Sequence, residues 1–277
     1  MHLYHPASFD EFLARAAPLL LAHEGEHGIM LSAAADAARS PALASGSYAV
    51  LAEQNGRVVA AALRTTAKLL LSREAAPGGI AALAEDALPQ ARVAVIGPTD
   101  SVAAFAAAAG GRWREGLTLG LHELRRVAWN HRGVAGAWRV AGAADTDTLL
   151  RWQERFSEEA EGLPADRGAL AADVAERLAA AALHVWEVGG APAACLAAVG
   201  PTPHGIRLAS VYTPPELRGR GYASALVARV SQALIDGGRD FVFLYTDLAN
   251  PISNAIYRRI GYVPVADARE LWYAGAG

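Results

Sequence analysis

The sequence of 277 residues has almost no cysteine and almost no lysine. Its one cysteine, Cys195, cannot form an internal disulfide, so a disulfide-stabilised scaffold is excluded. Lys68 is the only lysine, the other basic side chains are arginine, and the formal net charge is −3. Because the chain carries no net positive charge, no overall field attracts it to nucleic acid or to anionic lipid. We therefore expect neither as a partner.

The sequence also lacks a long hydrophobic run. The longest apolar stretches, such as Val102–Ala109, are far shorter than the roughly 20 residues that cross a membrane. The first six residues, MHLYHP, have neither the basic start nor the apolar run of a signal peptide. Hydrophobic residues nevertheless make up 53% of the chain, which is ample for a globular core. We expect a cytoplasmic protein that does not contact a membrane.

Hydrophobic periodicity and turn residues predict the same order of elements twice. In the first half we predict two helices within 8–39, a hairpin over 48–63, a strand over 68–72, a helix over 79–88, a strand over 92–96, a helix over 101–109 and a strand pair within 113–124. In the second half we predict a strand over 137–141, helices over 146–157 and 165–182, a hairpin over 183–199, a strand over 206–213, a helix over 219–237, a strand over 241–246, a helix over 252–260 and strands near 263 and 271–273. We interpret this order as an internal duplication of an α/β unit, with domains at 1–130 and 131–277.

One segment of the second half combines a strand end, a glycine-rich loop and a helix start. A β-rich run ends at Thr213, two prolines interrupt it, and the sequence RGRGYA at 218–223 opens an apolar-faced helix. Small residues let a ligand approach the backbone, and a helix start presents unpaired N–H groups with a partial positive charge. The segment therefore predicts a pyrophosphate cradle, to which Arg218 and Arg220 add local positive charge.

Two other interpretations of this loop stay open. Glycine can merely relieve backbone strain in a tight strand-to-helix turn. The pair Gly219-x-Gly221 after a strand also fits the dinucleotide fingerprint, which expects an acidic residue about 20 positions on, at the end of the next strand. Asp240 has the spacing but stands at the beginning of that strand, which weakens the dinucleotide interpretation.

A second motif follows further along the chain. Asn250 is followed seven residues later by Tyr257 and then by Gly261-Tyr262. Together with RGRGYA, which matches the pattern Arg/Gln-x-x-Gly-x-Gly/Ala, this spacing resembles the GNAT acyltransferase superfamily, whose members use acyl-coenzyme A (acyl-CoA). The resemblance covers about residues 137–273. It implies an α/β (α+β) fold with two tandem GNAT-like domains, each a mixed, mostly antiparallel sheet flanked by helices.

The resemblance also implies where acetyl-CoA or another acyl-CoA would bind as co-substrate. In this family the strand before the loop splays from its neighbour and its backbone pairs with the pantetheine arm, while the loop amides hold the pyrophosphate. The implied binding residues are Val211, Tyr212, Thr213, Arg218, Gly219, Arg220, Gly221, Tyr222, Ala223, Ser224, Asn250 and Ser253. Tyr257 would stand near the thioester sulfur as the catalytic proton donor, and it equally fits a core aromatic of its helix. No metal is expected.

The general base stays unassigned. Several family members have a glutamate five residues before the asparagine, where this chain has Tyr245. Asp247, Glu187 and a water chain are the alternatives. We expect an N-acyltransferase that moves an acetyl or other acyl group to a small-molecule or peptide amine by direct attack in a ternary complex, acting as a monomer or homodimer. The missing glutamate leaves a non-catalytic acyl-CoA-binding sensor as the alternative function.

The first half lacks the loop motif and the tyrosine that the second half has. No Arg-x-x-Gly-x-Ala pattern occurs between Lys68 and Arg92, and in the segment 97–105 Phe105 stands near the place of the tyrosine hydroxyl. We therefore expect a degenerate first half that binds no acyl-CoA, shapes the acceptor pocket and covers the edge of the partner sheet.

Three further sequence features have structural interpretations, with no role in catalysis. The sequence HEGEH at 23–27 fits the zinc-protease pattern His-Glu-x-x-His, but Gly25 disfavours the helix that this pattern needs, so we predict a polar turn between two helices. Cys195 lies in an apolar run and is predicted to be buried. The arginines within 123–132 are predicted to lie in a solvated linker.

Overall fold

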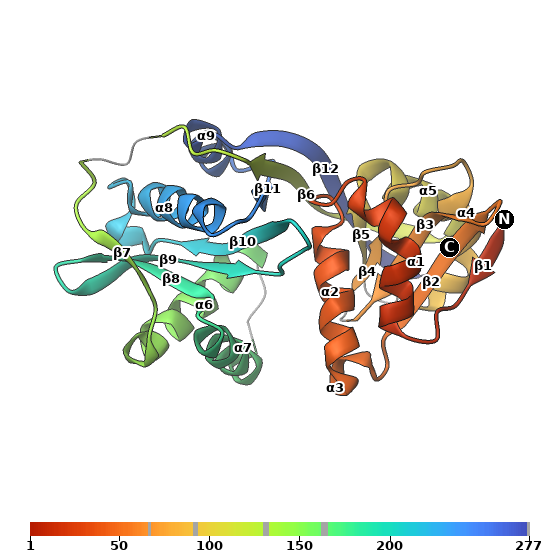
Figure 1. Cartoon of the computed structure of the whole chain (residues 1–277), viewed down its shortest axis with the longest axis horizontal. Coiled ribbons are helices and arrows are strands. Elements are labelled where there is room, and N and C mark those ends of the chain that lie inside the picture. The colour runs from red at the N-terminus through yellow and green to blue at the C-terminus, as the bar shows by residue number, and fades with distance from the viewer. Residues whose placement is uncertain (66–67, 91–93, 130–132, 162–165, 276–277) are drawn as a thin grey trace.

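The computed structural model describes residues 1–65, 68–90, 94–129, 133–161 and 166–275, and in these residues twelve strands form one continuous sheet (Figure 1). The helices are α1 (Phe9–Leu21), α2 (Gly28–Arg39), α3 (Pro41–Ala44), α4 (Gly79–Ala87), α5 (Thr99–Ala109), α6 (Thr146–Glu161), α7 (Arg167–Ala179), α8 (Tyr222–Asp236) and α9 (Pro251–Ile260). The strands are β1 (His2–Tyr4), β2 (Tyr48–Gln54), β3 (Arg57–Arg64), β4 (Lys68–Leu71), β5 (Ala94–Pro98), β6 (Arg112–Leu124), β7 (Ala137–Val140), β8 (Leu183–Val188), β9 (Ala191–Val199), β10 (Gly205–Tyr212), β11 (Phe241–Asp247) and β12 (Val263–Gly275).

The duplication predicted from the sequence is confirmed by the order of these elements. Each half has a strand, a helical pair, a hairpin, a strand, a helix, a strand, a helix and a final strand. Within each half one strand pair is parallel, β4–β5 in the first and β10–β11 in the second, and the other pairs are antiparallel. The mixed, mostly antiparallel sheet flanked by helices is therefore also confirmed.

Local sequence signals set several element boundaries. The hydroxyl of Ser8 accepts a hydrogen bond from the N–H of Glu11 at 3.1 Å and so caps the start of α1. Helix α9 ends at Ile260, and the next residue, Gly261, has a φ of 115°, in the left-handed region that glycine tolerates. Asn55 and Gly56 both have positive φ and close the β2–β3 hairpin, as this residue pair predicts.

The final strand of each half is exchanged with the other half. The sheet order is β1-β2-β3-β4-β5-β12-β6-β11-β10-β9-β8-β7, so β12 pairs with β5 of the first half and β6 pairs with β11 of the second. Strands β6 and β12 lie antiparallel to each other, from Arg112 opposite Gly275 to Glu123 opposite Val263. Figure 1 accordingly shows both chain ends on the side of the first half. Each half is completed by a strand from the other.

The strand pairs predicted within 113–124 and near 263 and 271–273 are wrong, because β6 and β12 are single strands of 13 residues each. The glycines of β6 make no turn. A side chain at Gly116 would meet Glu270 and Trp272, and one at Gly120 would meet Leu248, so these glycines leave room for neighbouring side chains. The predicted domain boundary between 130 and 131 lies outside the described residues and stays a prediction, as do the placements of residues 92, 93, 132 and 165.

Helices cover both faces of the second half's sheet. Leu226 and Val230 of α8 are fully buried against Leu244 of β11, while Leu149 of α6 packs with Cys195 of β9 on the opposite face. Each such leucine or valine withdrawn from water contributes about 1.5–3 kcal/mol. These layers hold β10 and β11 in place. Among the described helices, none has the length and apolar character that a membrane crossing requires.

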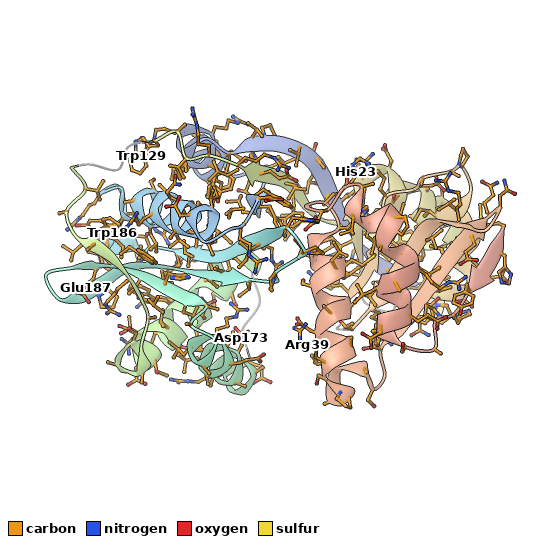
Figure 2. The ribbon with its side chains drawn as sticks, in the orientation of Figure 1. His23, Arg39, Trp129, Asp173, Trp186 and Glu187 are labelled. Atoms are coloured by element: carbon orange, nitrogen blue, oxygen red, sulfur yellow. The ribbon has the colours of Figure 1, made fainter. Side chains whose placement is uncertain are left out.

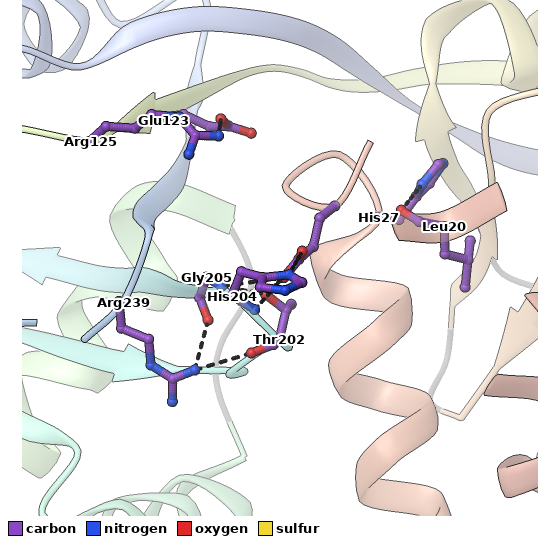
Figure 3. Close-up of polar contacts among 9 residues, drawn as sticks. Leu20, His27, Glu123, Arg125, Thr202, His204, Gly205 and Arg239 are labelled. Carbon is purple, nitrogen blue, oxygen red and sulfur yellow. Dashed lines mark hydrogen bonds and ion pairs between the residues drawn. The ribbon is translucent and has the colours of Figure 1, made fainter. Parts of the chain in front are cut away.

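The turn between α1 and α2 joins the two halves. The carboxylate of Glu24 accepts hydrogen bonds from the Thr202 hydroxyl at 2.5 Å and from the His204 N–H at 2.8 Å. Figure 3 shows Thr202 and His204 side by side at this contact. Arg239 donates to the Thr202 carbonyl at 3.1 Å in the same cluster. Gly28, at the start of α2, lies against the Phe243 ring of β11, where a larger residue would overlap that ring. The predicted polar turn over HEGEH is confirmed.

Candidate functional site

Strands β10 and β11 separate after a short stretch of pairing. They pair in parallel only from Gly205 to Arg207, opposite Phe241 to Phe243, although β10 runs on to Tyr212. The outer edge of β10 stays paired with β9, and that of β11 with β6. In the described part of the chain, the facing edges beyond Arg207 therefore have no strand partner. This is the splay that the family resemblance implies.

A β-bulge reshapes β10 inside the splay. Ala209 pairs with Ala197 and Tyr212 pairs with Cys195, so β10 has one extra residue over this interval. Ser210 has a φ of 50°, a left-handed conformation that is uncommon for a residue other than glycine. Beyond this bulge, the Tyr212 ring packs into the α6 face and its hydroxyl donates to Glu159 at 3.0 Å. Tyr212 is one of the expected binding residues, with Val211 and Thr213. Its side chain thus lies in the core, so only its backbone is available at the splay.

The loop after β10 presents free amides at the start of α8. Gly219 and Gly221 have φ values of 78° and 82°, and nothing lies within 4 Å of the place of a Gly219 side chain. The first backbone hydrogen bond of the helix runs from the Ala225 N–H to the Gly221 carbonyl at 2.9 Å. The amides of Tyr222, Ala223 and Ser224 therefore precede the helical ladder and, with the helix dipole, fit a diphosphate.

The two loop arginines have different surroundings. Arg218 donates to Glu159 at 2.6 Å and to the Thr213 carbonyl at 2.9 Å, so part of its positive charge is neutralised. Arg220 makes only a 3.4 Å hydrogen bond to the Glu216 carbonyl and is otherwise exposed. Glu159 comes from α6, and no sequence motif identified it.

Asn250 and Ser253 stand at the start of α9. The Asn250 side-chain oxygen accepts the Ser253 N–H at 3.1 Å and caps the helix, with Pro251 as the first helical residue. Asn250 is exposed, and its side-chain NH2 group donates to no other described residue. Its amide thus remains able to donate to a ligand, which is the role that the resemblance implies.

Tyr257 is both a core aromatic and a side chain with an unused hydroxyl. Its ring meets the Tyr262 ring edge to face at a centroid distance of 5.9 Å, within the core between α8, α9 and β11. The Tyr262 hydroxyl is hydrogen-bonded to Ser231 at 2.8 Å, whereas no described residue accepts a hydrogen bond from the Tyr257 hydroxyl. Burial raises the pKa of Tyr257 to about 12, so the hydroxyl keeps its proton at neutral pH.

Each of the three candidate bases has at least one protein partner. The Tyr245 hydroxyl donates to the backbone carbonyls of Gly25 at 3.2 Å and Glu26 at 3.0 Å, and burial raises its pKa. Asp247 accepts the N–H of Ala249 at 2.8 Å in a turn. Glu187 is paired with Arg139 at 2.5 Å and lies on the side of the second half away from the first (Figure 2).

Metal binding and thiol catalysis find no support in the described residues. His27 of the HEGEH sequence uses one ring nitrogen on the Leu20 carbonyl, at 2.9 Å (Figure 3), and the other on the Arg73 N–H, at 2.9 Å. The described part of the chain contains no group of three side chains that could hold a metal ion. Cys195 is fully buried, and burial raises its pKa to about 12, so the thiol stays protonated.

The matching place in the first half is blocked by a carboxylate. Helix α4 also starts after a glycine with positive φ, Gly78 at 86°, but there the N–H of Ile80 donates to the Glu74 carboxylate at 2.9 Å. A fixed negative charge at this amide repels a phosphate. Phe105 of α5 is fully buried and has no hydroxyl. Phe105 was identifiable from the sequence, whereas Glu74 was not.

Comparisons with known proteins agree with this geometry. Residues 146–262 match the model of the acetyltransferase (GNAT) family, whereas no curated protein matches the sequence. Among solved structures, a GNAT-family acetyltransferase from Colwellia psychrerythraea is 10% identical, with a TM-score of 0.59 over 99% of both chains. A Drosophila protein is 14% identical, with a TM-score of 0.67 over 98% of both chains.

A tandem GNAT protein from the clavulanic acid biosynthesis pathway is 15% identical, with a TM-score of 0.54 over 100% of this chain and 99% of that one. At these identities the structures share the fold. The family match and the shared fold together cover the splayed strands, the α8 loop and α9. Residues 146–262 of the second half therefore match the GNAT acetyltransferase family, and the whole chain has the fold of solved GNAT proteins, including a tandem one.

Proposed function

We propose that this protein transfers an acyl group from acyl-CoA to an amine, and that only the second half binds acyl-CoA. The observation that carries the proposal is the open edge of β10, which leads from Arg207 to the free amides at the start of α8. A pantetheine arm needs an extended backbone edge, and a pyrophosphate needs N–H donors at one end of it. The splayed strand β10 supplies the extended edge, and the start of α8 supplies the N–H donors at its end.

Each residue has a defined part in this reaction. The amides of Tyr222, Ala223 and Ser224 hold the pyrophosphate, while the backbone of β10 aligns the thioester. The amine nitrogen attacks the thioester carbonyl carbon, a C–N bond forms, the C–S bond breaks and the nitrogen loses a proton to water. The Tyr257 hydroxyl donates its proton to the leaving thiolate and is reprotonated from solvent. Alignment and proton donation are the main contributions, because no covalent enzyme intermediate is needed.

The protein contacts of the three candidate bases have a consequence for the amine. Tyr245 and Glu187 are engaged by protein groups and one oxygen of Asp247 accepts a backbone N–H, so in this proposal the amine binds in its neutral form or loses its proton to water. We expect the rate to rise with pH until the bound amine is deprotonated. The acceptor is a small molecule or a peptide in this proposal, and nucleic acid and membrane are not partners.

A second candidate is a non-catalytic acyl-CoA sensor. One observation favours it: Tyr245 replaces the glutamate of several family members, and its hydroxyl is already bound to two backbone carbonyls. Thiol release from acetyl-CoA, measured with the full chain and a panel of amines, separates the two functions. Acceptor-dependent release supports the transferase. Acetyl-CoA binding without release on any amine supports the sensor.

A further inference from the structure

Arg207 stands at the closed end of the splay. It is the last residue of β10 that pairs with β11, opposite Phe243, and the two strands separate directly after it. The α8 loop lies beyond the other end of β10. An arm with its pyrophosphate at that loop therefore brings its acyl end toward Arg207.

The side chain of Arg207 lies near α2 of the first half. A side chain at Gly200 would come within 3.9 Å of the Arg207 Nε atom and 3.0 Å of the Ser32 hydroxyl of α2. Arg207 thus lies close to α2, on the face of the sheet that Tyr245 also uses to reach the α1–α2 turn. Tyr257 belongs to the core on the opposite face, with α8 and α9.

Arg207 has no counter-ion within the described part of the chain. Its Nε atom is completely enclosed without a hydrogen-bond acceptor, and no described carboxylate pairs with its guanidinium. The nearby charged group is Arg177 of α7, which is itself paired with Asp173 at 2.8 Å and reaches the Ser210 hydroxyl at 3.5 Å. Burial, together with Arg177, lowers the pKa of Arg207.

Several other arginines of the chain do have a carboxylate partner, although Arg64 also has an enclosed Nε atom without an acceptor. Arg73, Arg139 and Arg218 each have a carboxylate oxygen within 2.7 Å. The Arg207 side chain is half-buried and its Nε atom is enclosed, so this guanidinium loses part of its hydration and gains no opposite charge, which costs folding free energy. Such a cost is tolerated at sites where a ligand supplies the missing charge.

We propose that Arg207 binds a carboxylate of the acceptor, so that the substrate is an amine that also carries a carboxylate, as an amino acid does. The planar guanidinium matches the two oxygens of a carboxylate. The acceptor enters on the face covered by α2 and α7, while Tyr257 protonates the thiolate from the opposite face. This inference rests on the proposed transferase function.

The first test compares acceptors that differ only in the carboxylate. The full chain is assayed for thiol release from acetyl-CoA with amino acids and with their methyl esters. We expect at least a tenfold higher kcat/KM for the acids. Arg207→Gln abolishes this preference by raising the KM for the acids, while the KM for acetyl-CoA stays unchanged. Equal rates for acids and esters in the wild-type protein would overturn the proposal.

The second test needs no turnover. N-acetyl amino acids and their amides are titrated calorimetrically into the full chain in the presence of CoA. We expect the acids to bind the wild-type protein and Arg57→Gln, an exposed hairpin control, at least tenfold more tightly than Arg207→Gln. Equal binding of the acids to the wild-type protein, Arg57→Gln and Arg207→Gln overturns the role of Arg207. Tight binding of the acids without any thiol release keeps this role and rejects the transferase instead.

A Tm measurement separates a loss of substrate binding in Arg207→Gln from a folding defect. Because Arg207→Gln removes an unpaired charge, we expect its Tm to equal or exceed that of the wild-type protein. A lower Tm together with a lost acid preference identifies a structural role and contradicts the proposal.

Discussion

Glu24 of the first half and His204 of the second form an ion pair, with 2.6 Å between Glu24 Oε2 and His204 Nδ1. The carboxylate raises the pKa of His204 through this hydrogen bond and its charge. Burial acts to raise the pKa of Glu24, but the hydrogen bonds from Thr202 and His204 outweigh it and lower that pKa. The contact between the halves is therefore sensitive to pH.

The sign of this dependence follows from the two shifts. The His204 contribution is complete below the unfolded histidine pKa of about 6.5 and is lost as pH rises through its raised folded pKa. The Glu24 contribution is complete above the unfolded glutamate pKa of about 4.3 and is lost as pH falls through its lowered folded pKa. We expect the Tm difference between wild type and Glu24→Gln to be largest between these values. A difference that does not vary with pH contradicts the ion pair.

Gly28 is predicted to be irreplaceable at the contact between the halves. A side chain there overlaps the fully buried Phe243 ring, so Gly28→Ala should lower the free energy of unfolding by about 1–3 kcal/mol. In an exposed helix the same change raises stability by about 1 kcal/mol, which makes the sign informative. Gly142→Ala, with open space around it, is the matched control in urea unfolding. A stabilised Gly28→Ala variant would show that α2 does not pack on Phe243.

The exchanged strands predict that the halves depend on each other. Fragments 1–130 and 131–277 each leave β5 or β11 without its neighbour, and open strand edges favour association. We expect the two fragments to copurify as a one-to-one complex when coexpressed and to aggregate or unfold alone. Two separately folded monomers, seen by size-exclusion chromatography, are the contrary result.

Tyr257 is predicted to act in the chemical step and not in binding. Removing a general acid typically costs 10²–10⁴-fold in rate, so Tyr257→Phe should lower kcat substantially and leave the Kd for CoA nearly unchanged. Tyr262→Phe is the matched control, because it removes only the 2.8 Å hydrogen bond to Ser231 and should affect stability alone. Unchanged turnover in Tyr257→Phe removes this hydroxyl from the mechanism.

Local features were predictable from the sequence, and contacts between distant segments were not. The α8 loop and the α9 cap depend on residues a few positions apart, so the spacing of Gly221 and Asn250 was enough to place them. The exchange of β6 and β12 could not be predicted, because either half's final strand offers the same kind of edge. Glu74, Glu159 and the pairing of Tyr245 with the α1–α2 turn depend on such tertiary contacts as well.

The central claim is that the start of α8 in the second half is the acyl-CoA site. Calorimetric titration of acetyl-CoA into the full chain tests it most directly, with Ala223→Glu as the variant and Ala223→Gln as its neutral control. Glutamate places at α8 the kind of charge that Glu74 places at α4. We predict one acetyl-CoA per chain for the wild type and the Gln variant, and at least a tenfold loss of affinity for Ala223→Glu. Two sites per chain, or equal binding by all three proteins, would contradict the account.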